Sequence, residues 1–473
     1  MKLRLNRESL TVYMILVVAI IFGGYLRLRN ITVDALWLDE VFSVATSHPD
    51  NSFLEVYQRS LVDVHPPFYQ LFLWFFYKLF GFGEMVGRYL SVIFGILLIP
   101  VAFLLGRQMF NCRVGLIAAW LVAVNFYLIT YSQETRSYEL LALLTTVSFV
   151  TFIKAIGGLD GRHVAIYALS AALLVNTHYF GFLVVTAQAL LVLSRWVETS
   201  FDKRLLYRFG LAGLFILLSI APHVSYVYLN FHRQGFWVPP PNNRFFIDLF
   251  NLYFGSLPLS VMCAALLMIG SVCLMKAERH REVLRLIIFW LVTCTVIPYV
   301  RSLYVQPVLT MRSLIILLPA LLIVLAFAIS LFKDQWAQVA VGVVVLCFSM
   351  TPLYTHERPI FTLENQLKPV SQMRDLVKDV IEQQIREPLY ASQFIEFDQY
   401  FRLLGSSTTV RSFKQLESDL LSPDRPAVVF FLGTREVQLP GERFMKEYCV
   451  DLLKETKKGD SVILEFRSNP PCL

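Results

Sequence analysis

Two acidic residues, Asp39 and Glu40, stand side by side in an otherwise apolar segment, residues 35–41. A carboxylate can accept the proton of an attacking hydroxyl group, and a neighbouring carboxylate can tune it or bind a cation. The pair follows the apolar run at residues 10–28, which places it near a membrane surface. The pattern predicts a reactive centre with Asp39 as general base and Glu40 as its catalytic partner. The structural alternative is that Asp39 caps a helix that starts near residue 41.

A second group of polar residues falls at the same predicted depth, although membrane segments usually exclude ionisable side chains. The group comprises His65, Arg88, Glu134, Arg136, Tyr138, His178, Tyr179, Arg301 and Arg312. Several such residues at one depth indicate a shared aqueous site. A planar guanidinium binds phosphate well, because it can donate two parallel hydrogen bonds. We therefore expect Arg136, with Arg88 and Arg312, to hold an anionic group.

Simpler structural interpretations compete with these roles. Arg136 could pair with Glu134 alone, and the Arg88 side chain could extend to the lipid headgroups as an anchor. His65 precedes two prolines and could simply donate to a backbone carbonyl. His178 and Tyr179 together could form a satisfied pair at the membrane interface.

A divalent metal is conceivable on Glu40, His65 and His178, but no fixed ligand spacing supports one. The sequence therefore indicates no certain cofactor. The net charge of +7 is explained by basic residues that anchor membrane segments. It gives no reason to expect a nucleic-acid partner, although a basic surface also suits anionic membrane lipids.

Composition places these residues in a polytopic α-helical membrane protein. Of the 473 residues, 56% are hydrophobic and only 16% are charged, and the mean hydropathy is +0.57. Apolar runs of about 20 residues can each cross a bilayer core of about 30 Å. About eleven spans are predicted, at residues 10–28, 86–106, 114–131, 139–157, 163–178, 180–195, 209–229, 257–275, 284–300, 311–331 and 335–353.

The distribution of Lys and Arg predicts the orientation of these spans. Basic residues are more frequent on the side that holds residues 2–7, 195–208 and 276–285 than on the opposite side. That bias predicts a cytoplasmic N-terminus, with Asp39 and Glu40 on the extracytoplasmic side.

The first extracytoplasmic loop, about residues 29–85, is long and contains two predicted interfacial helices. Residues 51–61 form an amphipathic pattern, and residues 68–78 are crowded with Trp, Tyr and Phe. The aromatic segment is short for a crossing and rich in interface residues, so we expect it to lie along the membrane surface. If it crossed instead, every later side assignment would be inverted.

The composition changes after residue 354, which divides a transmembrane domain (1–354) from an extracytoplasmic domain (355–473). Short β-prone runs at residues 427–432 and 461–466 follow a helix-like segment at 364–385, which predicts a small α/β domain. Its two cysteines, Cys449 and Cys472, either form a disulfide, which an oxidising compartment favours, or remain unpaired.

The polar motifs also follow a recognisable order along the chain. They are Trp37-Leu38-Asp39-Glu40, His65-Pro66-Pro67-Phe68-Tyr69, Phe80-Gly81 with Glu84 and Arg88, Tyr131 to Tyr138, Thr177 to Gly181, and Pro307 with Arg312 and Pro319. This order, over about residues 1–330, resembles the bacterial family 39 glycosyltransferases. These are similar to protein O-mannosyltransferases and lipid A aminoarabinose transferases.

The resemblance implies a bacterial inner-membrane glycosyltransferase of the C fold (GT-C), which takes a sugar from a polyprenyl phosphate. It implies transfer to an acceptor hydroxyl on a protein, a lipid or an envelope glycan, with inversion, at the outer face of the membrane. Asp39 matches the general base of the family. The phosphate-binding role passes to Arg136 and, with less support, to Arg88, Arg312 and His65. Glu134, Tyr138, His178 and Tyr179 would complete the site.

Two positions depart from the family pattern. Ser313 follows Arg312 where an aromatic residue is usual, and His65 stands where aminoarabinose transferases carry a lysine. The alternative from another class is a transporter or flippase for lipid-linked saccharides. Transporters place ionisable residues near the midplane in repeated halves, whereas in this chain they gather at one face and no repeat occurs.

Overall fold

A computed structural model of the chain describes residues 7–61, 63, 65–232, 238–355, 372–434, 439–458 and 461–469. The chain divides into two compact units. The first unit comprises residues 1–29, 50–76 and 88–366, and the second comprises residues 30–49, 77–87 and 367–473. The second unit thus includes two segments of the first loop besides the C-terminal region. The domain boundary at residue 354 stays a prediction.

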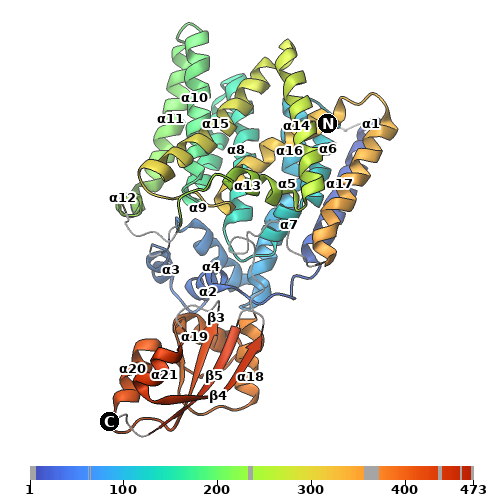
Figure 1. Cartoon of the computed structure of the whole chain (residues 1–473). Helices are drawn as coiled ribbons and strands as arrows, with labels where there is room; N and C mark the ends of the chain where they lie inside the picture. Colours follow the sequence, from blue (N-terminus) through green and yellow to red (C-terminus); the bar gives the residue numbers. More distant parts are fainter. Residues whose placement is uncertain are drawn as a thin grey trace. The chain divides into compact units, whose positions relative to one another are not determined.

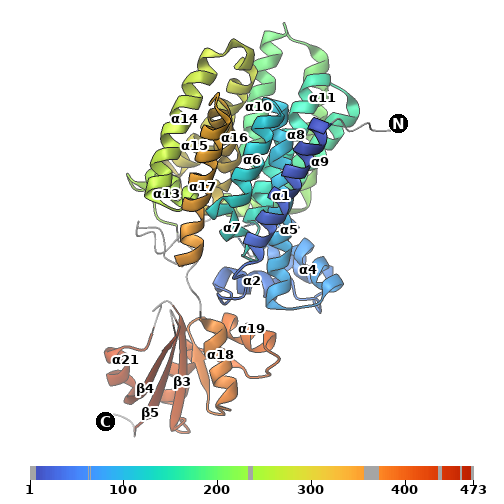
Figure 2. The same ribbon diagram turned by 90° about the vertical axis from the view of Figure 1, so that its right-hand side faces the viewer.

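The first unit is a bundle of helices (Figures 1 and 2). Its elements are α1 (Arg7–Leu28), α3 (Phe53–Ser60), α4 (Phe68–Phe80), α5 (Glu84–Met109), α6 (Cys112–Val124), α7 (Phe126–Ser132), α8 (Tyr138–Gly158), α9 (Gly161–Thr177), α10 (Gly181–Glu198), α11 (Lys203–Ile220), η1 (Ala221–His223), α12 (Val224–Phe231), α13 (Phe245–Phe254), α14 (Leu257–Lys276), η2 (Glu278–His280), α15 (Arg281–Tyr304), η3 (Arg312–Leu317), α16 (Leu318–Ser330) and α17 (Gln335–Thr355). Helices α4 and α5 continue into segments assigned to the second unit.

The apolar helices make the chain an integral membrane protein. Within the described residues, eight helices are long and apolar enough to cross a membrane, or nine if the bent pair α6 and α7 counts as one span. The prediction of about eleven spans is roughly consistent with this count. The remaining predicted spans also form helices, namely α9, with 17 residues, and α17. The two helices predicted in the first loop are present as α3 and α4, and their position along the membrane surface stays a prediction.

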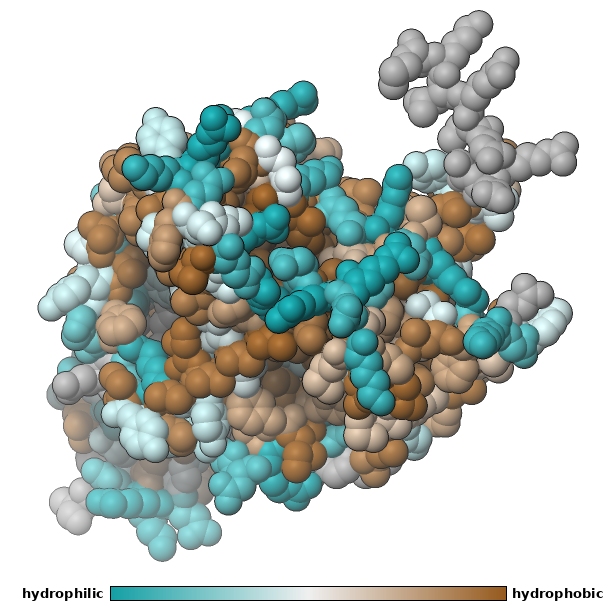
Figure 3. Space-filling model, turned by 90° about the horizontal axis from the view of Figure 1, so that it is seen from above, coloured by the Kyte–Doolittle hydropathy of each residue, from teal (hydrophilic) through white to brown (hydrophobic). Residues whose placement is uncertain are grey.

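Charged residues join several helix ends at one end of this bundle. Arg285 of α15 lies 2.5 Å from Glu198 at the end of α10, and Arg195 lies 3.9 Å from Glu282. Figure 3 views this end and shows hydrophilic side chains running across a hydrophobic surface. The loops between α10 and α11 and between α14 and α15 are therefore neighbours, as expected for basic segments predicted to share the cytoplasmic side.

The span predicted at residues 114–131 is broken into α6 and α7, whose axes differ by 57°. Asn125 makes this bend, because its side chain caps α7 through the Leu128 N–H (3.0 Å) and donates to the Tyr253 carbonyl (2.9 Å). The fully buried Arg27 donates to the carbonyls of Val122 and Ala123, both at 3.0 Å. These carbonyls would otherwise lack partners inside the membrane, where an unsatisfied polar group is costly.

The second unit contains a five-stranded sheet in the order β2-β1-β3-β5-β4. The strands are β1 (Leu389–Ala391), β2 (Val410–Ser412), β3 (Val428–Thr434), β4 (Val450–Lys458) and β5 (Ser461–Ser468). Strand β1 pairs in parallel with β2 and β3, and β5 pairs antiparallel with β3 and β4. The helices are α2 (Leu38–Thr46), α18 (Met373–Glu382), α19 (Phe394–Leu403), α20 (Phe413–Leu421) and α21 (Glu442–Tyr448).

The α/β prediction for this part of the chain is confirmed, and the two β-prone runs correspond to β3 and β5. Of the helix predicted at residues 364–385, α18 covers 373–382, and residues 364–371 lie outside the described residues. Cys449 is disulfide-bonded, whereas Cys472, its predicted partner, lies outside the described residues.

Candidate active site

A cluster of polar side chains in the first unit is assembled from connections between helices. Asp63 and His65 come from the segment between α3 and α4, and Arg136 comes from the turn between α7 and α8. His178 lies between α9 and α10, and Arg312 begins η3. Residues separated by up to about 250 positions in the sequence are thereby gathered in one region, as the shared predicted depth suggested.

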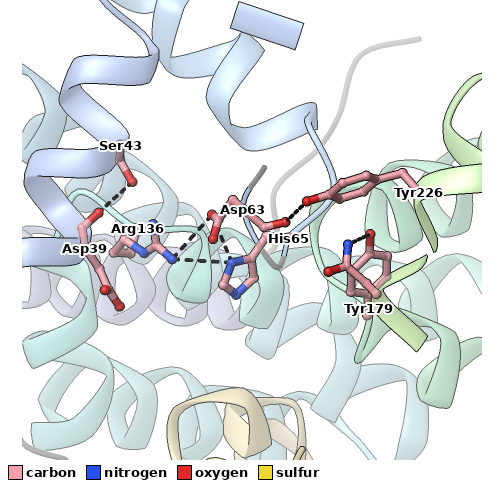
Figure 4. Close-up of polar contacts among 8 residues, drawn as sticks. Asp39, Ser43, Asp63, His65, Arg136, Tyr179 and Tyr226 are labelled. Atoms are coloured by element: carbon pink, nitrogen blue, oxygen red, sulfur yellow. Dashed lines mark hydrogen bonds and ion pairs between the residues drawn. The ribbon is translucent and has the colours of Figure 1, made fainter. Parts of the chain in front are cut away.

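Arg136 and His65 are in direct contact. Nη2 of Arg136 lies 3.3 Å from Nδ1 of His65 and 3.7 Å from Oδ2 of Asp63, and Oδ2 of Asp63 lies 3.2 Å from the same His65 nitrogen. These contacts are drawn in Figure 4. When His65 Nδ1 carries a hydrogen it donates to Asp63, and when it does not it accepts from Arg136. The Arg136 guanidinium therefore contacts His65 and Asp63, whereas the simpler interpretation gave it Glu134 alone.

The backbone around Arg136 is held by hydrogen bonds that orient the turn. The Glu134 carbonyl accepts from the Arg136 N–H at 2.8 Å and from the Ser91 hydroxyl of α5 at 2.6 Å. The Gln133 amide donates to the Arg27 and Arg29 carbonyls at 3.0 and 2.7 Å. The turn is therefore tied to α1 and α5, and the Arg136 guanidinium has a defined direction.

His178 contributes a neutral imidazole next to this pair. Its ring centroid lies 4.6 Å from that of His65, and its Nδ1 accepts from the Phe180 N–H at 3.1 Å. Burial lowers the pKa of His178 well below its usual value, and the nearby His65 and Arg136 lower it further. A neutral ring whose Nδ1 accepts must carry its hydrogen on Nε2. That buried nitrogen has no hydrogen-bond partner among the described residues, so it can donate to a ligand.

Tyr138 connects the cluster to Arg312. The Arg312 guanidinium carbon lies 5.5 Å from the centroid of the Tyr138 ring, within the range of a cation–π contact. The Tyr138 ring also lies 6.1 Å from the His65 ring and 5.9 Å from the His178 ring, between centroids. Tyr138 is buried and Arg312 half-buried. Together with the contacts of Arg136, this arrangement brings two guanidinium groups and one carboxylate into one cluster.

Tyr179 lies at the edge of the cluster beside α12. Its hydroxyl accepts from the Asn230 amide at 3.5 Å, and burial raises the pKa of Tyr179 to about 12. Tyr226, which like Asn230 belongs to α12, donates to the Asp63 carbonyl at 2.5 Å. Figure 4 shows both tyrosines on the side of Asp63 and His65 away from Arg136.

Two other predicted residues of the first unit are buried. Arg88 is fully buried near the start of α5, which is not the position of a side chain extended along lipid to the headgroups. It lies one helical turn before Ser91, whose hydroxyl donates to the Glu134 carbonyl in the segment that carries Arg136. The Glu134 side chain is also buried, and it is the Glu134 backbone carbonyl that accepts the two bonds from Arg136 and Ser91.

The predicted acidic pair lies in the second unit, at the start of α2. Asp39 is half-buried, and its carbonyl accepts from the Ser43 hydroxyl at 3.1 Å (Figure 4). Glu40 is fully buried and forms a capping box, in which its carboxylate accepts from the Trp37 N–H at 3.3 Å. The carboxylate that caps this helix is therefore Glu40 rather than Asp39, which the structural alternative had named.

The described residues contain no group of three or more His, Cys, Asp or Glu side chains that could hold a metal ion. The metal hypothesis on Glu40, His65 and His178 therefore gains no support from them. Glu40 also belongs to a different unit from the two histidines.

Asp63 and Tyr226 were not among the predicted site residues. Asp63 stands two positions before His65 in Asp-Val-His-Pro-Pro, so an acid near a candidate histidine was a usable signal. Tyr226 sits in an apolar run with no such signal. Only the fold brings its hydroxyl to the segment between α3 and α4.

Comparison with known proteins supports the resemblance. Residues 64–226, about a third of the chain, match the model of the dolichyl-phosphate-mannose-protein mannosyltransferase family. The matched stretch contains His65, Arg136, Tyr138 and His178 but not Asp39. No curated protein matches the chain significantly by sequence.

Solved structures match over almost the whole chain. ArnT from Cupriavidus metallidurans in the apo state has a TM-score of 0.62 at 12% identity, covering 97% of this chain and 98% of that one. The same protein bound to undecaprenyl phosphate has a TM-score of 0.60 at 13% identity, with 96% and 97% covered. The Archaeoglobus fulgidus oligosaccharyltransferase with Zn and sulfate has a TM-score of 0.53 at 13% identity, with 89% and 68% covered. The chain is therefore an integral membrane protein with the GT-C fold, and its residues 64–226 match the mannosyltransferase family model.

Proposed function

We propose that this protein transfers a sugar from a polyprenyl-phosphate donor to an acceptor hydroxyl at the extracytoplasmic face of the bacterial inner membrane. The observation that carries the proposal is the cluster of Arg136, His65, Asp63, His178 and Arg312. It provides cationic groups and a hydrogen-bond donor within a membrane-embedded helical unit. A phosphate carried by a lipid tail is the anion that such a position favours.

The donor phosphate is assigned to Arg136, with Arg312 and His65 as further contacts. Negative charge grows on the leaving phosphate as the sugar–phosphate bond breaks, and fixed positive charge stabilises it most in a water-poor site. The Nε2–H of neutral His178 is assigned to an oxygen of the phosphate or the sugar. The undecaprenyl phosphate bound to the structurally similar ArnT supports this class of donor.

The acceptor hydroxyl is assigned to Asp39 as general base. Attack on the anomeric carbon from the face opposite the phosphate inverts the configuration, and Asp39 takes the hydroxyl proton as the new bond forms. Glu40 supports the helix start through its capping box and is assigned to positioning and tuning Asp39.

The test is a transfer assay with purified protein in nanodiscs. The donors are radiolabelled undecaprenyl phosphate mannose and undecaprenyl phosphate aminoarabinose, and a bacterial membrane extract supplies acceptors. We expect transfer by the wild type and a loss of at least about a hundredfold in Asp39→Asn. Asp50→Asn, an exposed acid of the same loop, serves as the matched control and should retain activity.

Two results would contradict the proposal. Transfer that survives in Asp39→Asn would remove Asp39 as the base. Absence of transfer from either donor, together with movement of the labelled lipid across the bilayer, would favour the transporter or flippase.

A further inference from the structure

We infer that the C-terminal α/β region is a positioning element of the catalytic loop, acting through Tyr400 and Arg374 on the segment that leads to Asp39. This inference deepens the proposed function and rests on it for its catalytic readout. All the residues concerned belong to the second unit, so their contacts lie within one compact body.

Tyr400 makes the central contact. Its hydroxyl accepts a hydrogen bond from the Leu36 N–H at 2.7 Å, across 364 positions of sequence. Both residues are fully buried. A buried N–H that loses its acceptor is left unsatisfied, which is unfavourable, so this bond constrains the backbone three residues before Asp39.

The contact lies at the start of the helix that carries Asp39. Trp37 is the N-cap of α2, and its N–H is held by Glu40. Tyr400 therefore holds the peptide unit immediately before that capping box. The buried face of α2 includes Val41 and Val44, and α2 packs against α19, where Phe397 and Phe401 are fully buried.

Arg374 of α18 makes a second attachment to the same segment. Its Nη2 donates to the Val33 carbonyl at 3.2 Å, and its Nη1 lies 3.2 Å from the Glu84 carboxylate at the start of α5. The Arg374 and Glu84 side chains are 16% and 12% exposed, so water screens this ion pair less than a surface pair. One side chain thus links α18, the segment before α2 and the first turn of α5.

These two contacts suggest a function for Tyr400 and Arg374, which lie outside the motifs that indicated the catalytic site. A general base must be held within about 0.5 Å of its productive position, yet residues 30–37 form a loop outside regular secondary structure. Tyr400 and Arg374 supply hydrogen bonds to this loop from outside it. We therefore assign them as positioning residues, with no contact to substrate implied.

The first experiment measures hydrogen–deuterium exchange of the full-length protein in nanodiscs, without any donor. We expect Tyr400→Phe to speed the exchange of amides in residues 35–41 about tenfold, since it removes the acceptor of Leu36 N–H. Tyr390→Phe is the matched control. Tyr390 is also fully buried, and its hydroxyl donates at 2.7 Å to Asp419 in the same unit, away from α2.

The second experiment compares the steady-state kinetics of the same variants with undecaprenyl phosphate mannose or aminoarabinose, whichever supports transfer. We expect Tyr400→Phe to lower kcat about tenfold with an unchanged donor KM, because the residues assigned to the phosphate belong to the first unit. Arg374→Gln should lower kcat in the same way. Tyr390→Phe should leave kcat and KM within twofold of the wild type.

The inference is overturned if Tyr400→Phe alters the exchange of residues 35–41 no more than Tyr390→Phe does. It is equally overturned if the exchange rises while kcat stays at the wild-type value, since the contact would then be structural only. If the wild type transfers neither sugar, the proposed function fails, and the exchange experiment still decides whether Tyr400 holds the loop.

Discussion

Arg136 derives its predicted role from its neighbours rather than from its charge alone. Its guanidinium is 5% exposed and faces both His65 and Asp63. Asp63 offsets part of the charge and orients the imidazole, while Arg312 adds a second guanidinium through Tyr138. The arrangement keeps cationic groups oriented before a phosphate arrives, which is how preorganised charge lowers a barrier.

Replacing Arg136 tests this arrangement. We expect Arg136→Ala to lower kcat/KM for the lipid donor by roughly a hundredfold or more. Arg136→Lys should recover only part of the loss, because an ammonium lacks the planar paired donors. Arg301→Ala is the control, since the Arg301 guanidinium donates to the Phe231 carbonyl and lies over the Phe231 ring rather than against His65 or Asp63. Equal losses in Arg136→Ala and Arg301→Ala would argue against a specific phosphate contact.

His178 predicts a pH dependence of stability. An imidazole in the unfolded chain titrates near 6.5, and in the folded protein burial lowers the pKa of His178 well below that value. The unfolded chain therefore binds more protons on acidification. The contribution of neutral His178 to the free energy of unfolding is fully present above about pH 6.5. Below that pH it is lost, by at most about 1.4 kcal/mol per pH unit.

The measurement is the thermal unfolding midpoint in detergent between pH 7.5 and pH 5. We expect His178→Gln to reduce the loss of stability on acidification, because glutamine does not titrate and keeps an N–H donor. His232→Gln, at an exposed histidine that ends α12, should leave the pH dependence unchanged. An unaltered acid response in His178→Gln would show that other groups cause it.

At the scale of elements, the bend between α6 and α7 orients the turn that carries Arg136. Arg27 bonds the last carbonyls of α6 and also donates to the Ser132 hydroxyl of α7 at 3.1 Å. Gly95 of α5 lies against this contact. An added Cβ there would meet Ser132 Oγ, and would lie 2.5 Å from Arg27 Nε and 2.9 Å from Glu139 Oε1. The close packing of α1, α5, α7 and α8 therefore depends on a glycine at this position.

Gly95→Ala should destabilise the helical unit by about 1–3 kcal/mol through overpacking. Gly210→Ala on α11 is a matched control, because its added Cβ would meet nothing within 4 Å. Thermal unfolding and fluorescence-detected size-exclusion chromatography compare the two. A Gly95→Ala protein as stable as Gly210→Ala would mean that Arg27 and Ser132 can move aside without cost.

At the scale of the whole molecule, the predicted orientation in the membrane decides which side of the membrane the proposed site faces. Cys112 is an exposed free thiol at the start of α6, near the end of the bundle predicted to be cytoplasmic. Gln58 is exposed on α3, in the loop predicted to be extracytoplasmic. The two positions should therefore respond oppositely to a reagent that cannot cross the membrane.

In spheroplasts, a membrane-impermeant maleimide should label Gln58→Cys, made in a Cys112→Ser background, and should spare Cys112. The remaining free cysteines are replaced by serine or alanine in both proteins. Permeabilised cells should label both positions, because each is exposed. Labelling of Cys112 in intact spheroplasts would invert the orientation and place the proposed chemistry in the cytoplasm.

The sequence alone determined the membrane class, most of the spans, the two helices of the first loop and the α/β character of the C-terminal region. Each of these follows from local hydrophobic patterns, which act over one element at a time. The sequence also singled out Arg136, His65, Tyr138, His178 and Arg312 as candidates, because ionisable residues are conspicuous in membrane segments, and the structure brings them together.

Only the tertiary structure decided which of these residues touch and which carboxylate caps α2. The bend at Asn125, the pairing of Asp63 with His65 and the capping role of Glu40 depend on hydrogen-bond geometry that no periodicity records. The bond from Leu36 to Tyr400 spans 364 positions, and nothing at either end of that interval marks it. Long-range contacts of this kind arise from the packing of whole elements, so they become visible only when the chain is folded.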